Sequence, residues 1–297
     1  MDIRAILAGV LFAVMWSSAF TSARIIVADA PPLMALALRF LISGALGVAI
    51  ARWMGQTWHL TAEQWRATII FGICQNALYL GLNFVAMQNV EASLAAIIAS
   101  SMPLLVGVAG WLFLGQGVTK LEVIGLIVGF CGVLIIMGAR LSSGADPVGI
   151  GLCILGVLSL TVATLALKNA SSGGNFMMIV GLQMLVGSVV LWPAALVFDT
   201  PEVTMSAKLV VAFIYTTLVP GLAATLVWFW LVNRIGTVKA STFHFLNPFL
   251  GVAVAALVLS ESLSLTDILG VIIVTAGILA VQVSRQSNAA ETIATRT

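Results

Sequence analysis

The sequence predicts an all-α membrane protein in which ten transmembrane helices form two inverted repeats of five helices each. Three observations predict this fold class. Hydrophobic residues make up 61% of the 297 residues and charged residues only 8%, whereas an ordinary soluble domain carries roughly 25% charged residues. Ten apolar runs are long enough to cross a bilayer. A proline-containing pattern in the fourth run returns 145 residues later in the ninth.

The ten predicted spans follow from the length of the apolar runs, since a helix needs roughly 20 apolar residues to cross the hydrocarbon core. The breaks between the runs are short and rich in turn-forming residues, as in Asp29-Ala30-Pro31-Pro32. Residues 55–64 are predicted to lie at the membrane surface, with Trp58 and Trp65 as interfacial anchors. The spans are expected at about 5–27, 33–53, 66–87, 92–114, 121–139, 148–168, 175–198, 207–233, 238–259 and 266–283.

An internal duplication relates the two halves of the chain. Pro103 returns as Pro248 without any gap, inside a hydrophobic run where a chance match of proline is rare. Repeats of this kind are sought before finer assignments are made. The first repeat is expected at 5–139, the second at 148–283, and residues 284–297 are expected to form a disordered cytoplasmic tail. The glycines shared by the fifth and tenth spans are expected to let these two spans pack tightly. The same offset of 145 relates Gly125 to Gly270, Gly132 to Gly277, Leu112 to Leu257 and Leu114 to Leu259.

The distribution of lysine and arginine predicts the orientation of the chain, because these residues are enriched in cytoplasmic loops. With the N-terminus inside, nine basic residues lie on the cytoplasmic side and three outside, and ten spans return the C-terminus to the cytoplasm. Five spans per half turn the second half upside down relative to the first. The nine are Arg4, Arg52, Arg66, Lys120, Lys168, Arg234, Lys239, Arg285 and Arg296, and the three are Arg24, Arg140 and Lys208.

Inverted repeats are the architecture of many secondary transporters, in which the substrate site lies near the bilayer midplane at the repeat interface. The matching stretches in this chain read S-L-A-A-I-I-A-S-S-M-P-L-L-V-G in the first half and F-H-F-L-N-P-F-L-G-V in the second. With these stretches, the chain from about residue 6 to 283 resembles the EamA-type members of the drug/metabolite transporter superfamily. Among ten-span members it looks most like the YddG-type exporters of aromatic amino acids. The resemblance implies a protein of the bacterial inner membrane that exports such amino acids or related small metabolites.

The resemblance also identifies two departures and one match. The family frequently has Gly-Glu at the joint after the proline-containing span, where this chain has Gly115-Gln116 in the first copy and Ser260-Glu261 in the second. The glutamate of this pattern therefore occurs only at the second joint, which is predicted to lie outside. The match is Arg39, which falls where the family often has an arginine in the second span.

Polar side chains deep in a span are candidates for function, because lipid makes them expensive. In the third span Asn76, Tyr79 and Asn83 follow the spacing i, i+3, i+7 and would share one face of an α-helix. They would line a substrate cavity in one interpretation and form hydrogen bonds between helices in the other.

The first, eighth and ninth spans contribute a second group of candidates. His244 and Asn247 share a face of the ninth span, where the first copy has Ala99 and Met102. His244 would bind a substrate carboxylate or change its charge between pH 5 and 8, or it would be a neutral histidine bonded to a neighbouring helix. Trp16 with Ser17, and Trp228, place rings near polar groups, where they would stack on a flat ligand, attract an ammonium group or simply pack.

Arg39 lies within the second span, where a charge needs a partner or a water-filled cavity. One interpretation gives it a gating role through backbone carbonyls or an acid such as Glu91. The other has it attract a substrate carboxylate. Its counterpart in the second half is Gln183, at an offset of 144.

Pro103 and Pro248 lie well inside their spans. A proline within a helix removes a hydrogen bond and bends the helix at a fixed place. We therefore predict that the fourth and ninth spans hinge at these residues during alternating access. The alternative is that the prolines only set the shape of the helices.

The remaining features narrow the class of protein. Cys74, Cys131 and Cys153 lie in apolar runs without metal-ligand spacing, and no motif predicts a metal, a cofactor, a nucleic-acid surface or an enzyme active site. No Asp or Glu lies at the centre of a span, so either His244 couples transport to protons or the protein is a facilitator. Translocation of a lipid carrier on the same fold is the alternative within membrane transport. The expected partners are an amino-acid-like small molecule and the lipid bilayer, and the expected state is a monomer.

Overall fold

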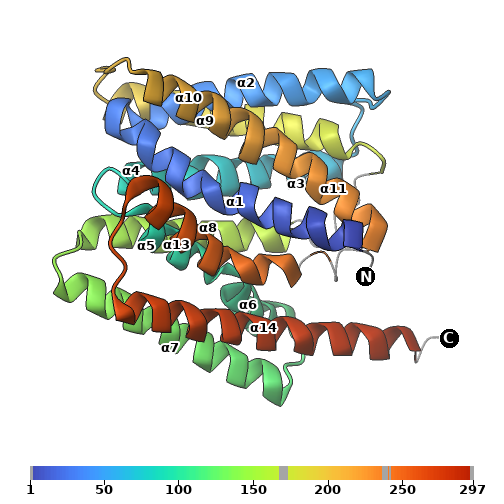
Figure 1. Cartoon of the computed structure of the whole chain (residues 1–297). Coiled ribbons are helices and arrows are strands. Elements are labelled where there is room, and N and C mark those ends of the chain that lie inside the picture. The colour runs from blue at the N-terminus through green and yellow to red at the C-terminus, as the bar shows by residue number, and fades with distance from the viewer. Residues whose placement is uncertain (1–2, 167–172, 236–239, 241, 295–297) are drawn as a thin grey trace. The chain divides into compact units, whose positions relative to one another are not determined.

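The computed structural model describes residues 3–166, 173–235, 240 and 242–294, and these residues form helices without any strand (Figure 1). Nine of the described helices are long and apolar enough to cross a membrane, and a shorter apolar helix covers Phe243–Leu259. The predicted all-α membrane fold is thereby confirmed. The helical segments are α1 (Ile3–Asp29), α2 (Pro32–Trp53), α3 (Ala62–Phe71), η1 (Gly72–Leu80), α4 (Gly81–Ala86), α5 (Ala92–Ser100), α6 (Met102–Leu114), α7 (Lys120–Ser142), α8 (Pro147–Ala166), α9 (Phe176–Phe198), α10 (Ala207–Leu218), η2 (Val219–Ala223), α11 (Ala224–Ile235), η3 (Thr242–Leu246), α13 (Asn247–Leu259) and α14 (Leu265–Ala294).

Some sequence-based expectations fall outside the described residues. These are the end of the sixth predicted span, the first residues of the ninth, and the basic residues Lys168, Lys239 and Arg296.

The last helix differs from the prediction of a disordered tail at 284–297. α14 continues through Ala294 and so includes ten residues beyond Ser284. The reason is local, because residues 285–294 contain neither glycine nor proline, the residues that most often end a helix.

Several of the spans are not uniform α-helices. The third contains the π-helical segment η1, and the eighth contains the π-helical segment η2 around Pro220. The fourth span breaks at Ser101 between α5 and α6, and a 3₁₀ segment, η3, precedes α13. Pro103 and Pro248 each occupy the second position of the new helix, where a missing N–H group costs nothing.

The described chain forms two compact units, each of which takes segments from both sequence repeats. The first unit contains Met1–Thr21, Ala92–Ala145 and Ala224–Thr297, and the second contains Ser22–Glu91 and Asp146–Ala223. The residues of α1 are divided between the units after Thr21. The compact units therefore do not coincide with the two repeats.

In the first unit, α7 and α14 lie side by side with their backbones in contact (Figure 1). A Cβ atom added to Gly277 would lie 2.4 Å from the Gly129 nitrogen, and one added to Gly125 would lie 2.8 Å from the Gly277 oxygen. One added to Gly270 would lie 3.4 Å from the Gly132 oxygen. Because Gly125 and Gly132 correspond to Gly270 and Gly277, the contacts 125–277 and 132–270 are images of one another. This exchange of partners is expected of two repeats related by a twofold axis, and it confirms the prediction that glycines let these spans pack tightly.

Carboxylates fix the ends of several helices of the first unit. Asp267, at the first turn of α14, forms an ion pair with Arg140 at 3.0 Å between Oδ2 and Nη2. Glu261 accepts hydrogen bonds from the backbone nitrogens of Ala92 and Ser93, at 2.8 and 3.0 Å, and so caps the start of α5. An acid at this position also suits the positive end of the helix dipole.

The second unit uses the same kind of packing between α2 and α9. A Cβ atom on Gly181 would lie 2.7 Å from the Val48 nitrogen, and one on Gly47 would lie 3.1 Å from the Gly181 Cα. Helices α3, η1 and α4 pack against α8 and α9. The segment between α2 and α3 is tied to α9 by hydrogen bonds from the Met178 nitrogen to the Gln56 side chain and from the Thr57 nitrogen to the Asn175 side chain.

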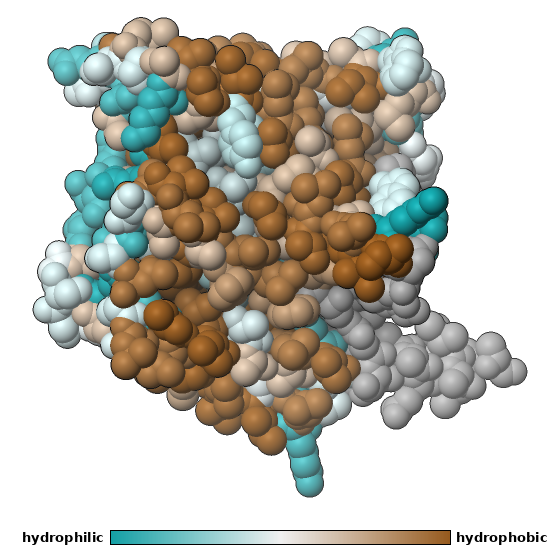
Figure 2. Space-filling model, viewed as in Figure 1, coloured by the Kyte–Doolittle hydropathy of each residue, from teal (hydrophilic) through white to brown (hydrophobic). Residues whose placement is uncertain are grey.

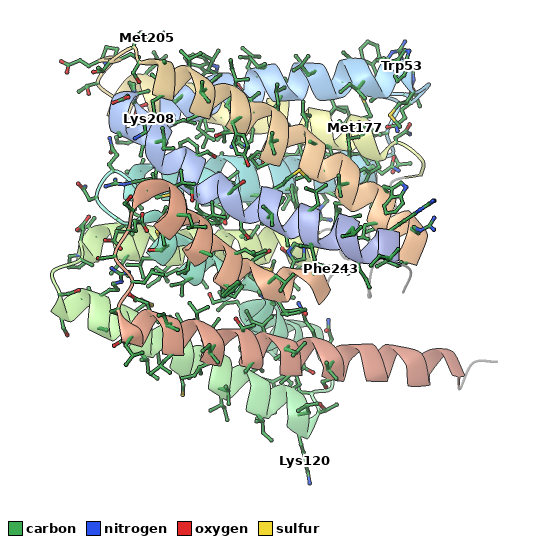
Figure 3. The ribbon with its side chains drawn as sticks, viewed as in Figure 1. Trp53, Lys120, Met177, Met205, Lys208 and Phe243 are labelled. Atoms are coloured by element: carbon green, nitrogen blue, oxygen red, sulfur yellow. The ribbon has the colours of Figure 1, made fainter. Side chains whose placement is uncertain are left out.

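Hydrophobic side chains also cover the outside of both units, as a lipid solvent requires (Figure 2). Leu257, Val189 and Ile127 are exposed by 84%, 70% and 60%. At the ends of the spans, Trp53 is 88% exposed. Lys120 is the first residue of α7, and its side chain extends away from the helix (Figure 3). The exposed surface thus has an apolar band with interfacial and charged residues at helix ends.

We predict that Gly277→Ala destabilises the protein, because the new methyl group would overlap the backbone of α7. Overpacking of this kind costs about 1–3 kcal/mol. The matched control is Gly138→Ala on α7, where an added Cβ meets nothing within 4 Å. Thermal unfolding of both variants in detergent, compared with the parent, measures the effect. Equal midpoints for the two variants would contradict the close approach.

Candidate functional site

Four rings gather in the first unit, from three elements that are distant in sequence. Phe12 and Trp16 come from α1, Trp228 from α11 and His244 from η3. The ring centroid of Trp228 lies 4.8 Å from that of Phe12 and 5.1 Å from that of His244. The centroids of Phe12 and His244 are 5.2 Å apart with the rings at 88°, an edge-to-face contact. We call these four residues the ring cluster.

The ring cluster combines buried and accessible members. Phe12 is 2% exposed, whereas Trp16, Trp228 and His244 are half-buried. The Trp16 ring completes the group at 5.8 Å from Phe12 and 6.2 Å from His244, measured between centroids. The neighbouring ring of Phe243, labelled in Figure 3, lies against Gly9 of α1, where an added Cβ would overlap it. The half-buried rings therefore keep part of their surface accessible, unlike Phe12.

A chain of polar groups ends at the histidine of this cluster. The Asn247 side-chain nitrogen lies 3.0 Å from His244 Nδ1. Ser17 Oγ lies 3.5 Å from both the side-chain and the backbone oxygen of Asn247. Since an amide nitrogen only donates, it requires His244 Nδ1 to accept, and the imidazole proton then resides on Nε2. The arrangement presents one neutral N–H donor among aromatic rings.

This chemistry suits a ligand that has both a flat ring and a hydrogen-bond acceptor. Indole and phenyl faces stack on flat rings and attract cations. A neutral imidazole N–H donates to a carbonyl or carboxylate oxygen. Five of the residues predicted from sequence, namely Trp16, Ser17, Trp228, His244 and Asn247, are therefore brought together in one unit.

The candidates of the third span belong to the second unit and point to two neighbouring helices. Asn76 donates from Nδ2 to the Gln183 backbone oxygen of α9 at 2.9 Å. Asn83 Nδ2 donates to the backbone oxygen of Tyr79 at 2.8 Å. A Cβ added to Gly156 of α8 would lie 2.7 Å from the same Asn83 Nδ2. Asn76 and Tyr79 lie in η1, whose π-helical geometry departs from the 3.6-residue period behind the predicted common face. Asn76, Tyr79 and Asn83 are buried, at 2%, 4% and 1% exposure.

Arg39 and Gln183 also lie in the second unit, on the paired helices α2 and α9. Arg39 is 5% exposed and Gln183 is 8% exposed. The Arg39 guanidinium carbon lies 5.1 Å from the centroid of the Phe40 ring. Within the described residues, no ion pair joins Arg39 to Glu91.

Sequence reasoning missed Phe12, which contacts three other rings, because an isolated phenylalanine in a hydrophobic run carries no signal. It also missed a capping pattern that the offset of 145 reveals. Thr119 accepts from the Glu122 nitrogen as Ser264 accepts from the Asp267 nitrogen, both at 3.1 Å, and both acids are buried. Among the described residues, no group of three potential ligands forms a metal site.

Comparisons with known proteins agree with this architecture. The model of the EamA-like transporter family matches residues 3–138 and 147–282. The chain is 26% identical over 281 residues to the "Uncharacterized transporter YvbV" of Bacillus subtilis, covering 94% of this chain and 92% of that protein. It is 28% identical over 273 residues to the "Uncharacterized inner membrane transporter YedA" of Escherichia coli, covering 89% and 87%. A crystal structure with 17% identity superimposes with a TM-score of 0.67, covering 96% of this chain and 100% of that one.

We predict that Asn247→Asp moves the imidazole proton of His244 to Nδ1. A carboxylate only accepts hydrogen bonds, so it requires a donor where the amide requires an acceptor. The ¹⁵N chemical shifts of the imidazole report which nitrogen is protonated. The chain has two histidines, so the His59→Gln variant shows which signals belong to His244. In the protein that keeps His59, the signals of His59 are the internal control, because Asn247→Asp should leave them unchanged. A protonated Nδ1 in the parent protein would contradict a hydrogen bond donated by Asn247 to His244.

Proposed function

This chain belongs to the EamA-like transporter family, and from that premise we propose that it exports aromatic amino acids and related small metabolites by alternating access. Two copies of the family pattern cover most of the chain, and its relatives are transporters rather than enzymes. It is a multi-pass membrane protein. The proposal places it in the inner membrane, as the name of the Escherichia coli relative states for that protein, with both termini in the cytoplasm.

The observation that carries the proposed substrate class is the ring cluster with its polar chain. The half-buried indoles of Trp16 and Trp228 offer faces for an aromatic side chain, while the His244 N–H, oriented by Asn247 and Ser17, offers a donor. An aromatic amino acid has the two matching features, a flat ring and an oxygen acceptor. For the second unit taken by itself, the buried polar residues Asn76, Tyr79 and Asn83 are proposed as residues that contact substrate.

The proposed movement uses the breaks at Pro103 and Pro248. Each proline follows an interruption of the α-helix, at the turn of Ser101 and in the 3₁₀ segment η3, and each stands near the start of a new helix. Hinges are residues at the ends of elements that absorb changes in backbone angles. The equivalent position of the two breaks would let the fourth and ninth spans bend alike.

We predict that the purified protein in liposomes transports labelled phenylalanine, tryptophan or tyrosine, and that Trp228→Leu reduces the rate at least tenfold. The loss follows from removal of a stacking surface for the ligand. Trp111→Leu is the control, since Trp111 is 54% exposed on α6 of the same unit. If all three amino acids are retained while another metabolite passes, the proposed substrate is wrong.

We also predict that Pro103→Ala and Pro248→Ala each lower the maximal transport rate several-fold while substrate affinity in detergent stays unchanged. Alanine restores an N–H group and favours a continuous helix. Pro147→Ala, at the first position of α8, is the matched control. If both single variants and the double variant transport at the parental rate, the prolines only set the shape of the helices and are not hinges.

A further inference from the structure

Arg39 is a buried cation within a membrane helix. It lies seven residues after Pro32, the first residue of α2, which corresponds to a depth of about 10 Å along the helix axis. Its exposed fraction is 5%. Charged side chains at such positions are costly and are expected to face a partner or a water-filled cavity.

The guanidinium has no anionic partner among the described residues. Its Nε is buried without a hydrogen-bond partner, and the ion pair found in the described chain joins Arg140 to Asp267 instead. The gating interpretation that pairs Arg39 with Glu91 therefore lacks its contact. The guanidinium carbon lies 5.1 Å from the centroid of the Phe40 ring, and a ring face does not neutralise a charge.

The guanidinium lies beside η2, and its buried Nε is the donor without a partner in the described part of the chain. A Cβ on Gly221 of η2 would lie 3.6 Å from Nη2 and 3.9 Å from the Ser43 Cβ, so Arg39 faces the π-helical turn that follows α10. The hydroxyl of Ser43 donates to the Arg39 backbone oxygen. The hydroxyls of Thr216 and Thr217 donate to backbone oxygens of α10. Each of these hydroxyl protons is thus directed to a carbonyl.

We propose that Arg39, next to the turn Val219–Ala223, is an anion-binding site of the second unit and that its ligand is a carboxylate. The planar fork of a guanidinium binds both oxygens of a carboxylate at once, with hydrogen bonds strengthened by charge. A bound anion would supply the charge that Arg39 lacks. The inference rests on the proposed function only for the class of ligand, since an exporter of amino acids and related metabolites meets carboxylates. A small inorganic anion such as chloride shares the required charge.

The test is calorimetric titration of the purified full-length protein in detergent with benzoate and with its neutral analogue benzamide. We expect the parent to bind benzoate at least tenfold more tightly than benzamide, and Arg39→Gln to lose this preference. Arg66→Gln is the matched control, since Arg66 is an exposed arginine of the same unit, and it should keep the preference. A parent that shows no preference for benzoate over benzamide, or an Arg39→Gln variant that keeps the preference, would overturn the proposal.

Two further measurements sharpen the result. Chloride titration in a chloride-free methanesulfonate buffer identifies the source of the anion: chloride that competes with benzoate supports an inorganic ligand at the same site, and benzoate binding alone supports a carboxylate ligand. If Arg39→Gln does not fold, Arg39→Lys keeps the charge but not the fork, and we expect it to bind benzoate about tenfold more weakly. Unchanged benzoate affinity in Arg39→Lys would overturn bidentate recognition.

The binding assay separates this inference from the proposed function. A parent protein that binds benzoate through Arg39 but transports no aromatic amino acid keeps the anion site and loses the proposed function. A parent that transports phenylalanine, while Arg39→Gln transports it at the same rate and keeps the benzoate preference, keeps the function and loses the site.

Discussion

The structure depends on close backbone contact between helices from opposite halves of the chain. In lipid, two helices gain little by hiding apolar surface from a solvent that is itself apolar, so their association relies on packing of small residues and on hydrogen bonds. Gly125, Gly129 and Gly277 supply this contact between α7 and α14, and Gly44, Gly47 and Gly181 supply it between α2 and α9. Each of the two compact units therefore has a glycine-lined seam that joins the first repeat to the second.

The same seams explain why the compact units differ from the sequence repeats. Each repeat offers glycine faces whose complements lie in the other repeat, so α7 packs on α14 and α2 packs on α9 across the two halves. The paired contacts 125–277 and 132–270 show that the two repeats meet through equivalent surfaces. The helix caps are equivalent in the two repeats as well, since Thr119 caps the first turn of α7 and Ser264 caps the first turn of α14.

Within this shared frame, function is expected where the two repeats differ. His244 and Asn247 stand where the first repeat has Ala99 and Met102, and these two polar residues carry the hydrogen-bond chain that reaches Ser17. Irregular backbone accompanies the polar residues: His244 lies in a 3₁₀ segment, Asn76 and Tyr79 lie in a π-helical segment, and Arg39 faces another. Such segments break the regular hydrogen-bond pattern at the places where a ligand would need to be recognised.

The sequence by itself determined the membrane class, the approximate limits of most spans, the 145-residue duplication and the positions of its prolines. These features are local or periodic. A membrane span is recognised from the hydropathy of a window of about 20 residues, and a repeat is recognised from residues that match at a constant offset. It also placed the candidate residues Trp16, Trp228 and His244 in the right spans. Only the tertiary structure decided that Phe12 joins them, that Asn76 and Asn83 point to different helices, and that no described acid pairs with Arg39. Side-chain convergence depends on which helices approach each other and on departures from 3.6 residues per turn, and both are set by contacts between residues that lie far apart in the chain.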